Sequence, residues 1–116
     1  QRAMHRLTRA MANHPELVAG EGRSCTELMR AMGGRVAIKT GAEAVFVAIL
    51  PEKGLGMALK VVDGGTRASE AAIAHLLVRA GVLEAGHPAT VKRLNPVQRN
   101  WRGIETGILR IAPGFA

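Results

Sequence analysis

Three short apolar segments follow one another between residues 33 and 63, and this feature constrains the fold more than any other. They cover residues 36–40, 44–50 and 55–62, and only three and four residues connect them. A parallel crossover needs about a dozen residues or more, so both connections must be hairpins. The segments therefore predict an antiparallel meander of three strands. The second segment is continuously apolar, which is typical of a strand covered on both faces.

Helices are expected before this meander. Apolar residues recur with helical spacing over residues 2–13, and the His-Pro pair that follows should end the helix. Residues 14–23 predict a loop. Ser24 and Glu27 match a capping box, which would start a second helix that runs through residue 32.

The part after the meander is less regular. Thr66 is a plausible N-cap for an alanine-rich helix over residues 67–80. Residues 82–100 contain glycine and proline breakers and predict irregular structure. Residues 104–111 are β-prone and are a candidate fourth strand. The predicted fold class is α+β, with an antiparallel meander of three to four strands and packed helices.

Composition narrows the class of protein. The 116 residues correspond to about one small domain. Aromatic residues are only 3% of the chain, so the core must be aliphatic. One cysteine rules out an internal disulfide and fits a reducing compartment, so we expect a cytoplasmic protein. No apolar run approaches the ~20 residues of a membrane helix. The first predicted helix starts without a cap, so we expect this chain to be a fragment of a larger protein.

The net charge of +7 lies on the two flanks of the chain. Residues 1–35 carry +3, residues 36–85 carry no net charge, and residues 86–116 carry +4. Solvated basic faces explain this pattern most simply. Contact with nucleic acid or with an acidic surface elsewhere in the same protein stays open. Nucleic acid is the weaker alternative, because few aromatic side chains are available to stack on bases.

Lys39, Thr40 and Gly41 end the first predicted strand and form the leading candidate site. A lysine in an apolar strand needs water or a partner for its ammonium group. The following glycine would let a ligand lie against the strand edge. A solvated lysine at a strand end is the simpler alternative, and the tripeptide alone does not decide between them.

Cys25 has two interpretations. It is either a buried structural thiol or a functional thiol whose pKa is lowered at a helix N-terminus. The histidines show no metal-ligand spacing, so this chain alone does not predict a zinc site. Neither serine is followed three residues later by a lysine, and no complete catalytic constellation is present.

Several motifs, in this order and spacing, resemble the C-terminal part of the Rhizobium-type L-asparaginase II family. They are His14-Pro15-Glu16-Leu17-Val18-Ala19-Gly20, Gly22-Arg23, Thr26, Leu28-Met29, Gly33-Gly34-Arg35-Val36, Lys39-x-Gly41-Ala42-Glu43, Gly54-Leu55-Gly56-x-Ala58-Leu59-Lys60, Asp63-Gly64, Arg67-Ala68 and Trp101-Arg102-Gly103-Ile104-Glu105-x-Gly107.

The resemblance implies a fold related to serine β-lactamases and glutaminases, and hydrolysis of L-asparagine to L-aspartate and ammonia. In that fold a Ser-x-x-Lys helix supplies the nucleophile, and a Lys-x-Gly strand lines the same cleft. Lys39 would then be catalytic, and Thr40, Gly41, Glu43 and Arg23 would bind substrate.

The resemblance also implies partners for this chain. The Ser-x-x-Lys half is absent from the sequence, so a missing N-terminal half or a partner chain would supply the serine. A homodimer is a further expected assembly. Cys25 would stand near the family's zinc site as a candidate metal ligand, with the remaining zinc ligands upstream. The alternatives are a non-catalytic basic module that binds nucleic acid and a structural half that pairs with another chain.

Overall fold

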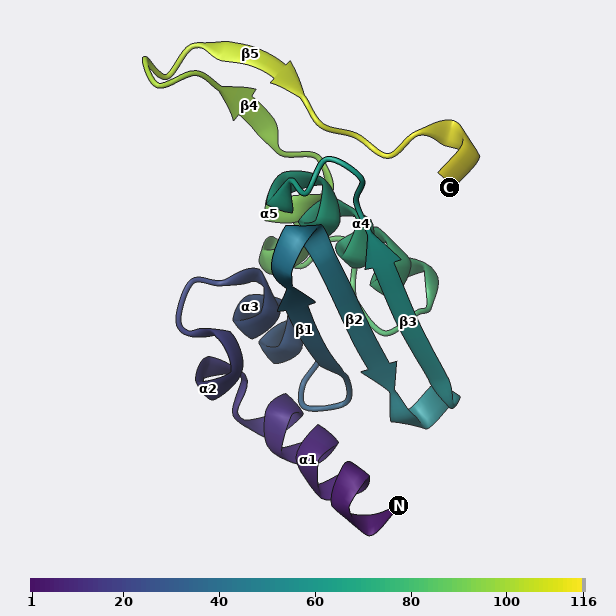
Figure 1. Cartoon of the computed structure of the whole chain (residues 1–116). Helices are drawn as coiled ribbons and strands as arrows, with labels where there is room; N and C mark the ends of the chain where they lie inside the picture. The colour runs from purple at the N-terminus through teal and green to yellow at the C-terminus, as the bar shows by residue number, and fades with distance from the viewer. Residues whose placement is uncertain (116) are drawn as a thin grey trace.

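The computed structural model describes residues 1–115 as an α+β unit with one three-stranded sheet and a separate two-stranded hairpin (Figure 1). The predicted fold class is confirmed. In chain order the elements are α1 (Arg2–Asn13), α2 (Pro15–Ala19), α3 (Ser24–Ala31), β1 (Ala37–Gly41), β2 (Val45–Leu50), β3 (Leu55–Lys60), α4 (Thr66–Arg79), α5 (Pro88–Leu94), β4 (Val97–Arg99) and β5 (Glu105–Ile108).

The three-stranded sheet is the predicted meander, with strand order β1-β2-β3 and antiparallel pairing throughout. Lys39 lies opposite Val47, and Gly41 lies opposite Val45 at the end where the chain turns from β1 into β2. On its other side, β2 pairs with β3, and there Val45 lies opposite Lys60. Lys39 and Lys60 therefore belong to the same face of the sheet, because alternate residues share a face.

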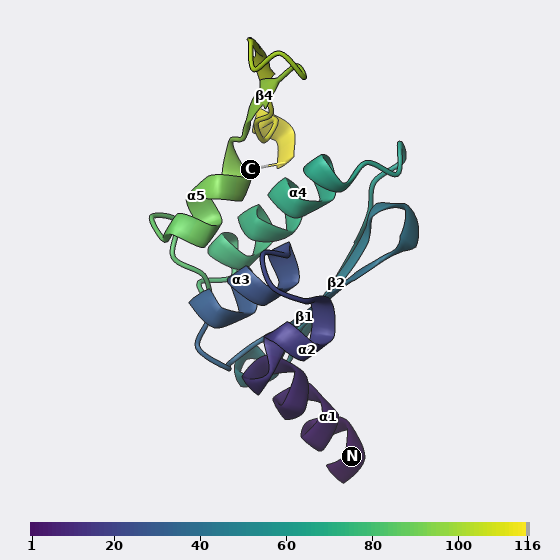
Figure 2. The ribbon, with the colours of Figure 1, turned by 90° about the vertical axis from the view of Figure 1, so that its left-hand side faces the viewer.

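Only one face of the sheet is covered by helices, so the prediction of a β2 strand buried on both faces is wrong. Phe46, Ala48 and Leu50 are buried, whereas Val47 and Ile49 keep 39% and 46% of their surface exposed. Figure 2 shows the reason: α3, α4 and α5 lie together on one side of the sheet. The apolar run in β2 thus serves one buried face and one apolar face that is open in this chain.

The core lies between this helical layer and the sheet. Leu28, Met29 and Met32 from α3 and its C-terminal end meet Ile73 and Leu77 from α4, all of them buried. They pack against the inner face of the sheet, where Phe46 is the one aromatic side chain of this core. The core is otherwise aliphatic, as the composition predicted.

The N-terminal segments differ from the predictions in two places. Helix α1 has the predicted bounds, but residues 15–19 form the short helix α2 instead of a loop, since proline is well suited to the first helical position. The predicted capping box is also wrong. Arg23 is the N-cap of α3, with no side-chain cap, and Glu27 contacts Arg93 on α5 instead.

The segments after the meander also differ from the predictions. Thr66 is the first residue of α4 rather than its cap, and the Asp63 carboxylate accepts a hydrogen bond from the backbone of Gly65 just before it. Residues 88–94, predicted to be irregular, form α5, because the His87 side chain caps its first turn. The β-prone C-terminal segment pairs with β4 and not with the main sheet.

None of the helices formed by residues 1–115 combines the length and the apolar character needed to cross a membrane.

Candidate functional site

The candidate site is the end of β1, where Lys39, Thr40 and Gly41 lead into the turn toward β2. Lys39 is exposed, and its Nζ donates a hydrogen bond to the backbone carbonyl of Thr40 at 2.6 Å. The Thr40 hydroxyl donates to the carbonyl of Val45 at 3.3 Å, across the turn. Because no helix covers this face, the ammonium group of Lys39 is open to a ligand.

The beginning of α3 lies against the same strand end. The backbone of Thr40 and the charged groups of Lys39 and Arg23 lie near enough to the Cys25 thiol to influence its pKa. Four of the six residues proposed from the sequence, Arg23, Cys25, Lys39 and Thr40, therefore lie around one strand end, with Lys39 on the open face of the sheet and Cys25 on the side covered by helices. Gly41 follows directly in the chain.

Cys25 is completely buried, and burial raises the pKa of its thiol. The Thr40 amide and the Lys39 and Arg23 charges lower this pKa, but burial has the larger effect. The interpretation of Cys25 as a low-pKa thiol is therefore wrong for this chain, and the structural interpretation is favoured.

A zinc site needs several ligands around one point. Within residues 1–115 no three His, Cys, Asp or Glu side chains gather around a common point. The described residues alone therefore do not form a zinc site.

Glu43 lies two residues after Gly41, in the turn between β1 and β2. Its backbone has φ 54° and ψ 43°, and Ala44 follows with φ 59°. The Glu43 side chain is exposed, and its Cα faces Gly64 in the turn that precedes α4. Glu43 therefore lies in the turn just beyond Gly41, at the end of the strand that contains Lys39.

Sequence reasoning missed an ionic network beside the site. Arg93 on α5 is 5% exposed, and its Nη1 lies 2.6 Å from the Glu27 carboxylate on α3. Its Nε lies 4.0 Å from the carboxylate of Glu70 on α4, which also acts electrostatically on Cys25. The network ties three helices together next to Cys25. No spacing in the sequence indicates it, because its members come from helices far apart in the chain.

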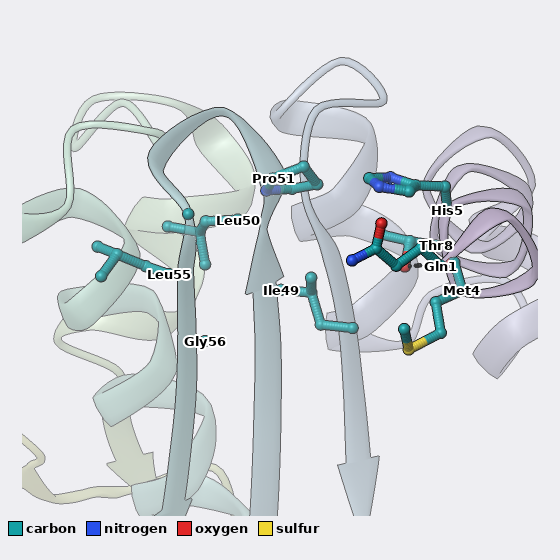
Figure 3. A pocket seen from close by; sticks show the side chains of 10 residues that line it. Gln1, Met4, His5, Thr8, Ile49, Leu50, Pro51, Leu55 and Gly56 are labelled. Atoms are coloured by element: carbon teal, nitrogen blue, oxygen red, sulfur yellow. Dashed lines mark hydrogen bonds between the residues drawn. The ribbon is translucent and has the colours of Figure 1, made fainter.

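A groove lies at the other end of the sheet, between α1 and the turn from β2 to β3 (Figure 3). It has a volume of about 560 Å³, and Met4, His5, Ile49 and Leu55 are among its lining residues. Lys39 lines neither this groove nor the smaller one beside α2. Neither of these two grooves therefore provides a cleft at Lys39.

The sequence model of the L-asparaginase II family matches residues 1–111, which is nearly the whole chain. A search of curated proteins finds no match. The matched range contains the end of β1, the start of α3 and the turn with Glu43, so the residues gathered at the candidate site all lie inside it. The chain therefore belongs to the L-asparaginase II family.

Proposed function

We propose that this chain forms part of an amidohydrolase that converts L-asparagine to L-aspartate and ammonia, with a serine nucleophile from outside this sequence. The family match supports asparagine hydrolysis as the reaction class. The observation that carries the site assignment is the position of the exposed Lys39 at the end of β1, with Arg23 near enough for both charges to act on the Cys25 thiol. An exposed ammonium and a nearby guanidinium offer two cations to an amino-acid substrate.

The proposed reaction is acyl transfer. The serine oxygen attacks the side-chain amide carbon and gives up its proton. The C–N bond breaks as the amide nitrogen takes up a proton and leaves as ammonia. Water then hydrolyses the resulting ester, which releases aspartate and restores the serine hydroxyl. Lys39 would stabilise negative charge that develops on the reacting oxygen or on the serine. Thr40 and Gly41 would line the strand edge along which the substrate lies, and Arg23 would pair with its carboxylate.

The open face of the sheet supports the proposal that more polypeptide packs here. Val47 and Ile49 expose 39% and 46% of their surfaces on this face. Exposed apolar surface of this kind commonly marks an interface. In the proposed complete enzyme, the N-terminal half or a partner chain that carries the serine would provide the missing contacts, and a homodimer is a further expected assembly.

Ammonia release from L-asparagine tests the proposal in the complete protein, prepared with the polypeptide that contains the serine. We expect aspartate and ammonia in equal amounts, and no turnover by residues 1–116 alone. L-Glutamine in the same assay defines the preference between the two amides. The proposed function would be refuted if the complete protein bound asparagine without hydrolysing it, or did not bind it at all.

One observation favours a second candidate function, the binding of single-stranded nucleic acid. Trp101 is 96% exposed in the loop of the β4–β5 hairpin, which extends away from the main sheet, with Arg99 and Arg102 beside it in the chain (Figure 1). Exposed aromatic side chains near cations can stack on bases. Arg99, however, is already paired with Glu105.

The chain has a single tryptophan, so its fluorescence reports directly on this loop. The second candidate predicts that oligonucleotides quench Trp101 fluorescence at low salt, and that the effect weakens steeply as salt rises. Unchanged fluorescence at low salt would exclude this function.

A further inference from the structure

The turn between β1 and β2 holds two consecutive non-glycine residues in the left-handed region of backbone conformation. Glu43 has φ 54° and Ala44 has φ 59°. A side chain at such a φ costs free energy that glycine avoids. Strain of this kind persists only where the surrounding structure enforces it, and it is concentrated at functional sites.

The surroundings explain the conformation of Ala44. Ala44 is buried, and its carbonyl accepts a hydrogen bond from the backbone amide of Val61 at 3.2 Å. Gly41 and Val45 close the turn as the last pair of the β1–β2 ladder. The backbone is therefore held in place from both sides, and the buried methyl group gives the second strained residue a packing role.

Glu43 has no equivalent packing role. Its side chain is exposed, and a glycine would satisfy the same backbone conformation without strain. Within residues 1–115 the Glu43 carboxylate makes no hydrogen bond or ion pair. The two lysines nearest in the sheet register, Lys39 and Lys60, donate instead to the backbone carbonyls of Thr40 and Val61. The strained turn thus holds an exposed carboxylate without a partner among the described residues, two residues beyond Gly41.

We propose that Glu43 binds the α-ammonium group of a free amino-acid amide, while Arg23 binds its α-carboxylate. This inference rests on the proposed function and narrows its substrate class. A zwitterionic substrate requires both charges within one site, and Glu43 is the exposed carboxylate in the turn that follows Lys39, Thr40 and Gly41. A blocked substrate such as N-acetyl-L-asparagine has no ammonium group for Glu43 to bind.

Two variants of the complete protein test this role. Glu43→Gln removes the charge and keeps the shape, and Ala44→Gly relieves the neighbouring strain without altering the carboxylate. We expect Glu43→Gln to lower kcat/KM for L-asparagine by about 10- to 100-fold, the range for a lost charged hydrogen bond, mainly through KM. Activity toward N-acetyl-L-asparagine should stay within about threefold. Ala44→Gly should stay within about threefold for both substrates.

A third variant separates binding from folding. Glu43→Gly should raise the melting temperature of residues 1–116, because glycine adopts the left-handed conformation without strain. The same variant should lose activity toward L-asparagine as Glu43→Gln does. A more stable but less active variant is not expected if Glu43 serves only the fold.

The outcomes separate this inference from the proposed function. If the wild-type enzyme does not hydrolyse L-asparagine, the proposed function fails, and this inference fails with it. If the wild type is active and Glu43→Gln hydrolyses L-asparagine within about threefold of it, only the role of Glu43 is overturned. Equal losses on L-asparagine and N-acetyl-L-asparagine would also overturn it, because the ammonium group would then be irrelevant.

Discussion

Replacing Arg93 by alanine should destabilise this chain far more than replacing its neighbour Lys92, although both side chains reach Glu27. Arg93 is 5% exposed, and its Nη1 lies 2.6 Å from the Glu27 carboxylate and donates to the Ala89 carbonyl at 3.1 Å. Lys92 is 61% exposed, and its Nζ lies 3.2 Å from the same carboxylate. The pair thus compares a buried and an exposed cation on one acceptor.

The magnitudes follow from burial. A hydrogen bond to a charged group contributes about 1.5–3 kcal/mol, and breaking a buried ion pair costs about 3–5 kcal/mol. Glu27 keeps Lys92 when Arg93 is lost, so we expect Arg93→Ala to lower the free energy of unfolding by about 2–3 kcal/mol. Lys92→Ala should cost about 0.5 kcal/mol, because exposed pairs contribute little.

Urea unfolding followed by circular dichroism measures both values. Arg93→Met serves as a control that keeps much of the buried stem, and it also removes the Nε atom that has no hydrogen-bond partner. We expect its cost to be smaller than that of Arg93→Ala. If Arg93→Ala and Lys92→Ala differ by less than about 0.5 kcal/mol, the argument from burial is wrong.

Three further predictions concern the fold. The hydrogen bond from Arg93 lowers the pKa of Glu27. The ionised Glu27 carboxylate therefore contributes fully to stability above its unfolded-state pKa, and this contribution is lost as the pH falls through the folded-state pKa. Glu27→Gln should flatten the fall in the free energy of unfolding below about pH 4. Burial should make Cys25 react with a disulfide reagent at pH 8 at least ~100-fold more slowly in the native chain than in urea, and equal rates would contradict its burial. Phe46→Ala should lower the free energy of unfolding by about 3–4 kcal/mol, whereas Val47→Ala should lower it by less than about 1 kcal/mol. Similar losses of stability for the two variants in calorimetry would contradict the one-sided burial of β2.

The sheet was predictable from the sequence because its evidence is local. Connections of three and four residues permit only antiparallel pairing, and β1, β2 and β3 follow from that constraint. Which faces are covered was not predictable, because an apolar run such as β2 reads the same whether one or both faces pack. The structure decides this by placing α3, α4 and α5 together on one side of the sheet.

The errors around the helices arise from contacts that local patterns do not contain. Glu27 has the spacing of a capping-box residue, yet Arg93, far along the chain, binds it instead. The pattern around helix α5 predicts irregular structure because Pro88 resembles a helix breaker. In the structure, Pro88 instead occupies the first turn of α5, and the His87 side chain caps that turn.

The candidate site was predictable in part. The resemblance pointed to Lys39, Thr40 and Arg23, and the structure places all three near Cys25. The strained backbone of Glu43 had no signal in the sequence, since a glutamate in a turn does not reveal its φ.

Lys39→Ala, compared with Lys53→Ala in the complete protein, tests the central claim most directly. Lys53 is also exposed but lies in the turn between β2 and β3, at the other end of the sheet. If Lys39 stabilises charge during amide hydrolysis, Lys39→Ala should lower kcat/KM for L-asparagine by about 100-fold or more, and Lys53→Ala should stay within about threefold of the wild type. Equal activity of the Lys39→Ala variant and the wild type would contradict the assignment of this strand end as the active site.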